Sequence, residues 1–254
     1  MNCMYFEEEK PIIEIRDFSL YMNNREVLKS INLNLYNNES VLIYGERNSG
    51  KSALLRSFVH LNEELFSNVY GKGDIKYRGK DVREQDKRYL RSNITYTEPQ
   101  YLQNLNYISL KELLKVSLGI TPQNLSYEHI SLLKKLDLMD KFIDLKSLKY
   151  YNDLSNWSSA DKLSLLLFVS LAQNPKVFMF DSILDHIDDV LLKKIKDVIL
   201  DINQNRILIF ATRNLFRYLD ICNRIIVLKE GKIVFDSIPK EFIINFKQNN
   251  FKNL

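Results

Sequence analysis

One segment of this sequence combines the residue types and the spacing of a phosphate-binding loop. Residues 45–52 read Gly-Glu-Arg-Asn-Ser-Gly-Lys-Ser and fit the pattern G-x-x-x-x-G-K-S/T. Such a loop curls so that successive backbone N–H groups point at phosphate oxygens, which favours glycine, and the N-terminus of the following helix adds partial positive charge. The sequence therefore predicts a nucleotide site. The residues expected to contact the nucleotide are Gly45, Asn48, Ser49, Gly50, Lys51 and Ser52.

An acidic residue far along the chain is the second candidate for this chemistry. Lys51 is expected to reach the β and γ phosphates, and the Ser52 hydroxyl to bind Mg²⁺, which completes its octahedron with phosphate oxygens and water. The apolar run at 177–180 ends in Asp181. An acid at the carboxyl end of a buried strand lies near the metal that the serine holds. We expect Ser52 and Asp181 to bind Mg²⁺; a helix cap or a surface turn is the alternative role of Asp181.

The loop requires a strand before it and a helix after it, and the sequence supplies both. Residues 41–44 form a short apolar run, and residues 51–61 have the helical spacing of apolar side chains. Further along, helical and strand-like segments alternate, which is typical of a mostly parallel sheet covered by helices, with ligands at the carboxyl ends of the strands. The expected later segments are helices at 158–172 and 188–202 and strands at 177–180 and 207–210.

Other regions flank this α/β unit. The first forty residues read as extended segments joined by polar turns, which predicts an antiparallel β region. Residues 101–151 show helical spacing and are expected to form a helical subdomain inserted into the fold. A closing hairpin at 225–235 precedes a terminal helix near 240–246. We find no linker or repeat, so the expectation is a single domain, 1–254, of the α/β class.

The composition narrows the class of protein. The chain has 254 residues, of which 45% are apolar, and 36 lysines and arginines against 32 aspartates and glutamates give a net charge of +4. A disordered or fibrous polymer is excluded, and the scattered positive charge does not indicate nucleic-acid binding. The longest nearly apolar stretch, 163–172, is about half of the ~20 residues that a membrane-spanning helix needs. Two cysteines and the lack of a leader-like start predict an intracellular protein.

In their order along the chain, these segments resemble the ATP-binding subunits of ABC transporters over residues 12–242. The resemblance implies a P-loop NTPase fold of ABC type that binds ATP and Mg²⁺. It also implies that Tyr21 stacks on adenine, unless it is an ordinary strand aromatic, and that Asp188 is the aspartate of the family's D-loop. The segment 56–78 looks most like the phosphate-import branch of the family.

Two catalytic positions depart from the family pattern. The family has a glutamate that polarises the attacking water directly after the metal-side aspartate, whereas this chain has Ser182. Asp185 is the alternative base, and a solvated loop acid or a helix cap is the other interpretation of it. Arg213 replaces the switch histidine, and arginine can donate to a phosphate but cannot shuttle a proton at neutral pH. We expect slow hydrolysis, because general-base catalysis typically contributes about 10²–10⁴-fold.

Two binding positions are also altered. In the family's signature loop, which wraps the γ-phosphate held by the opposite subunit, Ser158 matches the serine and both glycines are replaced; the alternative register begins at Leu154-Ser155. Losing the glycines restricts the backbone that must approach the phosphate. For the glutamine that links the metal to the transporter, Gln100 is assigned a catalytic and metal-binding role, with Thr97 as the alternative position.

The resemblance implies partners as well as ligands. Two such subunits would sandwich ATP between the phosphate loop of one and the signature of the other, as a homodimer or as a heterodimer with an intact ATPase paralogue. Transmembrane permease subunits would contact the helical subdomain. The chain would then lie at the cytoplasmic face of the membrane. No nucleic acid is expected among its partners. Phosphate or a related anion is the implied substrate for import. The alternatives are an ATP-sensing or assembly protein and, against the evidence of the loop, a chain that binds no nucleotide.

Overall fold

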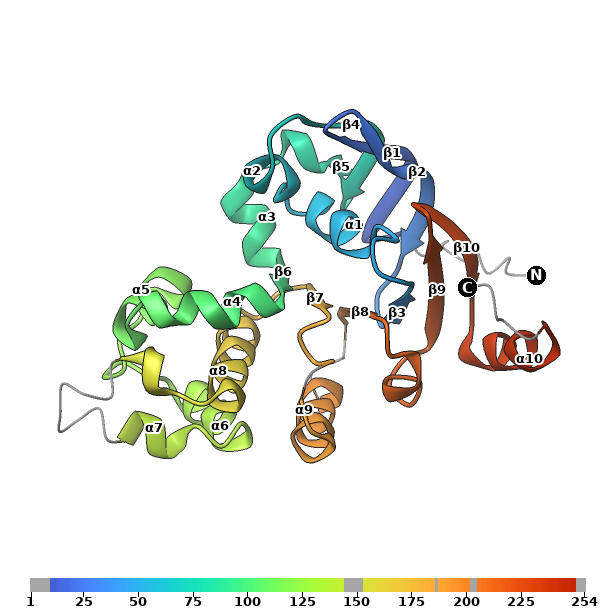
Figure 1. Ribbon diagram of the computed structural model, residues 1–254. Helices are drawn as coiled ribbons and strands as arrows, with labels where there is room; N and C mark the ends of the chain where they lie inside the picture. Colours follow the sequence, from blue (N-terminus) through green and yellow to red (C-terminus); the bar gives the residue numbers. More distant parts are fainter. Residues whose placement is uncertain (1–9, 144–152, 186, 202–204, 250–254) are drawn as a thin grey trace, which may run out of the picture.

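The computed structural model describes residues 10–143, 153–185, 187–201 and 205–249 of the chain. These residues form two β-sheets with helices packed around them, and a separate group of helices extends from one side of the larger sheet (Figure 1). Within the described segments, no helix combines the length and the apolar character needed to cross a membrane.

The larger sheet is mostly parallel, as the alternating pattern predicted. Its strand order is β10-β9-β3-β8-β7-β6, and β10 pairs antiparallel with β9 while the other neighbours are parallel. Tyr44 lies opposite Thr212, and Asp181 lies opposite Ala211. The carboxyl ends of three strands therefore meet at one edge. The strands are β3 (Ser40–Tyr44), β6 (Ile94–Thr97), β7 (Val177–Asp181), β8 (Ile207–Thr212), β9 (Arg224–Lys229) and β10 (Lys232–Ser237).

Strands β3, β6, β7 and β8 of this sheet are buried on both faces, which explains why they read as continuous apolar runs. Side chains alternate between the faces along each strand. On β3, Leu42 packs into one hydrophobic cluster, and its neighbours Val41 and Ile43 pack into the other. On β7, Phe178 and Met179 divide in the same way. The sheet thus separates two hydrophobic cores, which pack against its opposite faces.

The smaller sheet is antiparallel, with the order β2-β1-β4-β5, and it covers the helix that follows the phosphate loop. The predicted N-terminal β region is present and consists of the two long strands β1 and β2, which β4 extends. Bulges interrupt the pairing of β1 with β2, where Asp17 and Ser30 adopt positive φ. The strands are β1 (Ile13–Met22), β2 (Arg25–Leu35), β4 (Val69–Tyr77) and β5 (Lys80–Asp81).

The chain between β6 and β7 is helical in its described part. Serines begin α5, α6 and α8 through capping boxes, in which Ser109, Ser126 and Ser158 accept from the N–H three residues on. Positions 144–151 of the predicted subdomain lie outside the described residues. The helices are α4 (Pro99–Asn104), α5 (Leu110–Leu118), α6 (Tyr127–Lys135), α7 (Met139–Ile143) and α8 (Ser159–Ala172), with 3₁₀ turns at Leu105–Tyr107 and Leu154–Asn156.

The remaining helices pack against the sheets. The terminal α10 places Phe242 in the same core cluster as α8 and α9, and Phe242 is 1% exposed. These helices are α1 (Lys51–Ser57), α2 (Asn62–Leu65), α3 (Lys87–Asn93), α9 (Asp189–Asp201) and α10 (Pro239–Asn249), with 3₁₀ turns at Val82–Glu84 and Leu215–Arg217.

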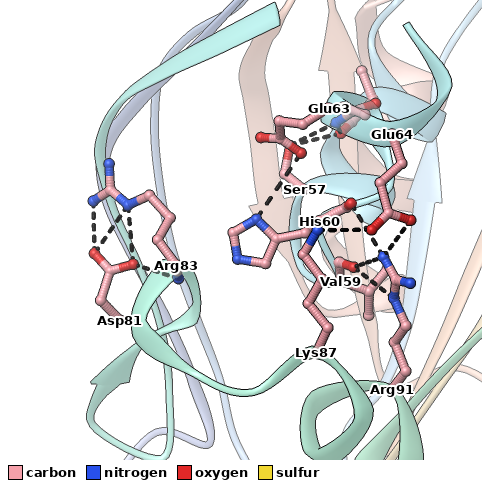
Figure 2. Close-up of polar contacts among 11 residues, drawn as sticks. Ser57, Val59, His60, Glu63, Glu64, Asp81, Arg83, Lys87 and Arg91 are labelled. Atoms are coloured by element: carbon pink, nitrogen blue, oxygen red, sulfur yellow. Dashed lines mark hydrogen bonds and ion pairs between the residues drawn. The ribbon is translucent and has the colours of Figure 1, made fainter.

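Polar contacts hold the end of α1, the helix that begins in the phosphate loop (Figure 2). Arg91 of α3 donates to the carbonyl oxygen of Val59 through Nε and Nη2, at 3.1 and 3.0 Å, and to that of His60 at 3.2 Å. Carbonyls just beyond a helix end lack helical partners, so this guanidinium satisfies them. Glu64 pairs with Arg91 and with Lys87, each at 2.8 Å.

We expect Arg91→Ala to lower the free energy of unfolding by about 1–3 kcal/mol, because it leaves two carbonyls without a donor. Lys87→Ala is the matched control, since it breaks only an exposed ion pair with Glu64 and should cost under about 1 kcal/mol. Urea unfolding of both variants measures the difference. Equal losses would show that the carbonyl contacts do not hold α1.

Candidate nucleotide site

The two loop glycines occupy positions that a side chain would fill. A Cβ on Gly45 would lie 2.3 Å from the carbonyl oxygen of Leu228 and 2.6 Å from Oγ of Ser49. Gly50, the N-cap of α1, has a φ of 106°, and a Cβ there would lie 2.8 Å from Leu28. Both glycines are therefore required by the local backbone, and the loop curls over the start of α1 as the pattern predicted.

Lys51 folds back over this loop. Its Nζ donates to the carbonyl oxygens of Gly45 at 2.5 Å and Glu46 at 3.0 Å, and it lies 3.4 Å from Oγ of Ser49. The residue is 7% exposed, and burial lowers the pKa of its ammonium group from the ordinary value. The nearby guanidinium of Arg213 lowers this pKa further, while Asp181 acts in the opposite direction. An anion beside Lys51 would therefore be favoured electrostatically.

Asp181 lies at the end of β7, beside the start of α1. It is 3% exposed, and burial raises the pKa of its carboxyl group. Hydrogen bonds from Ser52 and Tyr96 act in the opposite direction, because they stabilise the carboxylate. The Tyr96 hydroxyl lies 2.8 Å from Oδ2. The structure thus places Ser52 near enough to Asp181 to influence the pKa of its carboxyl group, which is the arrangement predicted for a magnesium site.

A chain of buried polar residues that no sequence pattern indicates extends from Asp181. The Tyr96 hydroxyl also lies 2.9 Å from Oε2 of Glu98, and it accepts from Nε of Arg56 at 3.1 Å. Arg56 and Glu98 form a close ion pair. Glu98 is 4% exposed and directly precedes α4. The burial of Glu98 beside a predicted metal ligand is known only from the fold, so the sequence offered no local signal for it.

The two positions weighed for the family's glutamine lie elsewhere. Gln100 is exposed on α4, whereas Thr97 is buried and donates from Oγ1 to the carbonyl oxygen of Met179 at 3.2 Å. The side chain that this turn directs toward α1 is that of Glu98, which pairs with Arg56. The catalytic and metal-binding role of Gln100 stays a prediction.

Ser182 and Arg213 follow neighbouring strands at the same edge. Ser182 is half-buried with a φ of 55°, and its N–H donates to the carbonyl oxygen of Ala211 at 2.8 Å. Its hydroxyl lies 3.4 Å from the same oxygen. Arg213 is exposed and close enough to Lys51 to influence its pKa. A hydroxyl and a permanently charged guanidinium offer no general base at these two positions.

Asp185, the alternative base, is engaged in the structure of the loop. Its Oδ1 accepts from the hydroxyls of Thr212 at 2.6 Å and Tyr218 at 2.8 Å, and its carbonyl oxygen accepts from Arg217 at 2.9 Å. These contacts tie the segment after β7 to the segment after β8. Asp188 caps α9, because its Oδ1 accepts from the N–H of Leu191 at 2.8 Å. His186 lies outside the described residues.

We expect Asp185→Asn to lower the free energy of unfolding by about 1–3 kcal/mol, because the two charge-assisted hydrogen bonds that Oδ1 accepts become weaker neutral ones. The rate of phosphate release should stay at the wild-type level. Thermal unfolding and a release assay on the same sample test both statements. A loss of release without a loss of stability would make Asp185 the base.

Ser158, the signature serine in the preferred register, is the N-cap of α8. Its Oγ accepts from the N–H of Asp161 at 3.1 Å and donates to Oδ2 of the same residue at 2.8 Å. Asp161 also pairs with Lys141 at 3.1 Å. Ser158 is exposed, whereas Trp157 before it is 6% exposed and belongs to the core. A carboxylate therefore stands beside the hydroxyl that would face a partner's phosphate.

Tyr21 lies on the antiparallel sheet. Its ring stacks on Tyr70 with centroids 4.8 Å apart, and its hydroxyl lies 3.0 Å from Oε1 of Glu26. Glu26 and its neighbour Arg25 line a cavity of about 750 Å³ together with residues 48–53 of the phosphate loop. Adenine stacking by Tyr21 stays a prediction; the structure places Glu26 between its hydroxyl and that cavity.

The residues present fit a nucleotide with its metal. The cavity is bounded by the loop, by Lys51 and by Ser52, and the glycines keep the loop free of side chains that would fill its backbone curl. A hydroxyl and a carboxylate are oxygen donors, which Mg²⁺ prefers. Bound Mg²⁺ would supply neutralisation of phosphate charge, and Asp181, whose pKa burial raises, would gain a counter-ion.

Comparison with known proteins decides the family. The model of the ABC transporter family matches residues 28–184, more than half of the chain. The chain belongs to this family. Membership implies that it binds ATP, usually with Mg²⁺, and identifies it as an ATP-binding domain of ABC transporter type. The expected fold is confirmed: an ATP-bound bacterial exporter of the Atm1 family matches with a TM-score of 0.72 at 17% identity, over 93% of this chain and 40% of that one.

Two relatives of this ABC domain differ in length. The phosphate import ATP-binding protein PstB 1 of Streptococcus pyogenes serotype M1 is 26% identical over 244 residues, which cover 94% of each chain. An ABC transporter ATP-binding protein of Methanosarcina mazei is 27% identical over 230 residues, or 89% of this chain. The chain spans 38% of that relative's length.

Proposed function

We propose that this chain is the ATP-binding subunit of an ABC transporter that imports phosphate or a related anion. The observation that carries the proposal is the phosphate loop at the start of α1 with the buried Asp181 carboxylate near Ser52, which would provide both sides of a Mg-ATP site. The likeness to a phosphate import protein over 94% of both chains supports the substrate class. In this role, binding of Mg-ATP brings two ATP-binding subunits together, and this dimerisation is coupled to a conformational change of the permease.

We further propose that hydrolysis depends on a partner subunit. Ser182 and Arg213 supply no base, and Asp185 is held by two hydroxyls. In a homodimer, the Asp161 carboxylate beside Ser158 would face the opposite γ-phosphate, and like charges disfavour that contact to the extent that the Lys141 ion pair leaves the carboxylate's charge uncompensated. A heterodimer with an intact paralogue would complete this chain's phosphate loop with the paralogue's signature. The converse site, completed by this chain's altered signature, would retain the paralogue's catalytic glutamate.

A cleft beside the helical segment is the proposed docking site for the permease. It has a volume of about 680 Å³ and lies between the end of α1, β6 and helices α4, α5 and α8. Apolar side chains dominate its lining, and two of them, Tyr107 and Val116, are 90% and 82% exposed. Exposed apolar side chains around a groove are typical of an interaction site. A helix of the permease that faces the cytoplasm is the proposed occupant.

Uptake of radiolabelled phosphate tests this function against the ATP-sensing alternative. In cells that encode the chain, deletion of its gene should lower uptake, and Lys51→Ala should fail to restore it where the wild-type gene succeeds. Unchanged phosphate uptake in the deletion strain would contradict the import role. If ATP-dependent dimerisation of the purified chain persists in that case, the sensing function is favoured.

A further inference from the structure

The hydrogen bond from Tyr96 to Asp181 is part of a network of contacts that also includes Glu98 and Arg56. Three buried residues, Asp181, Tyr96 and Glu98, are 3%, 8% and 4% exposed, so water does not replace the bonds between them. Oδ2 of Asp181 lies 2.8 Å from the Tyr96 hydroxyl, and Ser52 is near enough to lower the pKa of the same carboxyl group. The direction of that carboxylate therefore depends on where the Tyr96 hydroxyl is held.

A tyrosine hydroxyl carries one proton, and two carboxylates are within its reach. Asp181 lies at 2.8 Å and Glu98 at 2.9 Å from the Tyr96 oxygen. Arg56 favours donation of this proton to Asp181, because it forms an ion pair with Glu98. It also donates from Nε to the Tyr96 oxygen at 3.1 Å. With Glu98 satisfied by the guanidinium, the Tyr96 proton can be given to Asp181. The guanidinium side chain is 16% exposed, so this pair is only weakly screened by solvent.

We propose that Tyr96 is a positioning residue for magnesium: its hydroxyl orients the Asp181 carboxylate toward Ser52, and the Arg56–Glu98 pair fixes that hydroxyl. The proposal rests on the proposed function, since it takes the site as one for Mg-ATP. Groups that orient a metal ligand typically change metal affinity by about 10–100-fold when removed. The Tyr96 hydroxyl should therefore influence the gain in ATP affinity that Mg²⁺ provides more than the affinity for ATP itself.

The test measures ATP binding to the whole chain by titration calorimetry, once in excess Mg²⁺ and once in EDTA. The measured quantity is the dissociation constant in EDTA divided by the dissociation constant in Mg²⁺, which is the gain in ATP affinity that the metal provides. For Tyr96→Phe we expect this ratio to fall about ten-fold, with binding in EDTA unchanged within about two-fold. Tyr127→Phe is the matched control, because Tyr127 is 87% exposed on α6 and the same atom is removed far from the site.

A second variant separates positioning from folding. Glu98→Gln keeps an acceptor near Tyr96 but weakens the pair with Arg56, since the charge-assisted bond becomes a neutral one. We expect a smaller fall in the ratio than for Tyr96→Phe, with a cooperative thermal transition retained. If Tyr96→Phe does not fold, Glu98→Gln alone decides the matter.

Each other outcome overturns the proposal. If the wild type shows the magnesium-dependent gain and both variants keep it in full, Tyr96 does not position Asp181. If the variants lose affinity equally in Mg²⁺ and in EDTA, the role is structural. If the wild type itself binds no ATP in either condition, the proposed function fails together with this inference, and the wild-type titration identifies that case.

Discussion

Lys51→Ala should weaken Mg-ATP binding by about 10- to 100-fold, because hydrogen bonds to charged groups are worth about 1.5–3 kcal/mol and each 1.4 kcal/mol is ten-fold. The ammonium group of Lys51 donates hydrogen bonds to the carbonyl oxygens of Gly45 and Glu46 in the loop. Burial lowers its pKa, so a phosphate group arriving there would gain a poorly solvated cation as its counter-ion. Titration calorimetry with Mg-ATP measures the loss.

Two further variants make that result specific. Lys51→Met keeps most of the side-chain volume and removes only the charge and its donors, so it should weaken binding as Lys51→Ala does. Lys80→Ala is the matched control, because it deletes an exposed ammonium group on β5. If Lys80→Ala weakens binding to the same extent, general charge and not the loop lysine attracts the nucleotide.

Ser182→Glu should raise the rate of phosphate release by about 10²-fold, the lower end of the range for general-base catalysis. The position directly follows Asp181, at the edge where the phosphate loop and the end of β8 meet. Its φ of 55° lies in the left-handed region, which is similarly unfavourable for serine and for glutamate, so the substitution adds little backbone strain. The full range is not expected, because Arg213 and the Ser158–Asp161 contact are unchanged.

Release of phosphate from Mg-ATP, followed continuously, measures this gain. Ser182→Gln is the control, since an amide of the same length cannot accept a proton from water. The variant Ser182→Glu combined with Lys51→Ala should return to background. A Ser182→Gln rate equal to that of Ser182→Glu would show that side-chain length, and not a base, limits the reaction.

The sequence was sufficient for the parts of the fold that depend on local patterns. Residues 41–44 and 177–180 were recognisable as strands because a sheet buried on both faces requires continuous apolar runs. The phosphate loop was recognisable because its backbone excludes any side chain at Gly45. Asp181 followed from the same logic, as an acid that ends a buried strand.

Long-range contacts account for the parts of the site that sequence reasoning missed. Tyr96 and Asp181 are separated by 85 residues, and Arg56 and Glu98 by 42, so no local pattern joins them. Gln100 drew attention because it is the glutamine nearest the end of β6, whereas the turn into α4 buries Glu98 and leaves Gln100 exposed. Asp185 was weighed as a loop acid, and only the fold reveals its contacts with Thr212 and Tyr218.

Titration of the purified wild-type chain with Mg-ATP, with phosphate release followed on the same sample, tests the central claim most directly. Our account predicts saturable binding at one site per chain, together with release near background. Saturable binding with brisk release that depends on Lys51 would contradict the assigned effects of Ser182 and Arg213. No binding at any accessible ATP concentration would contradict the nucleotide site itself.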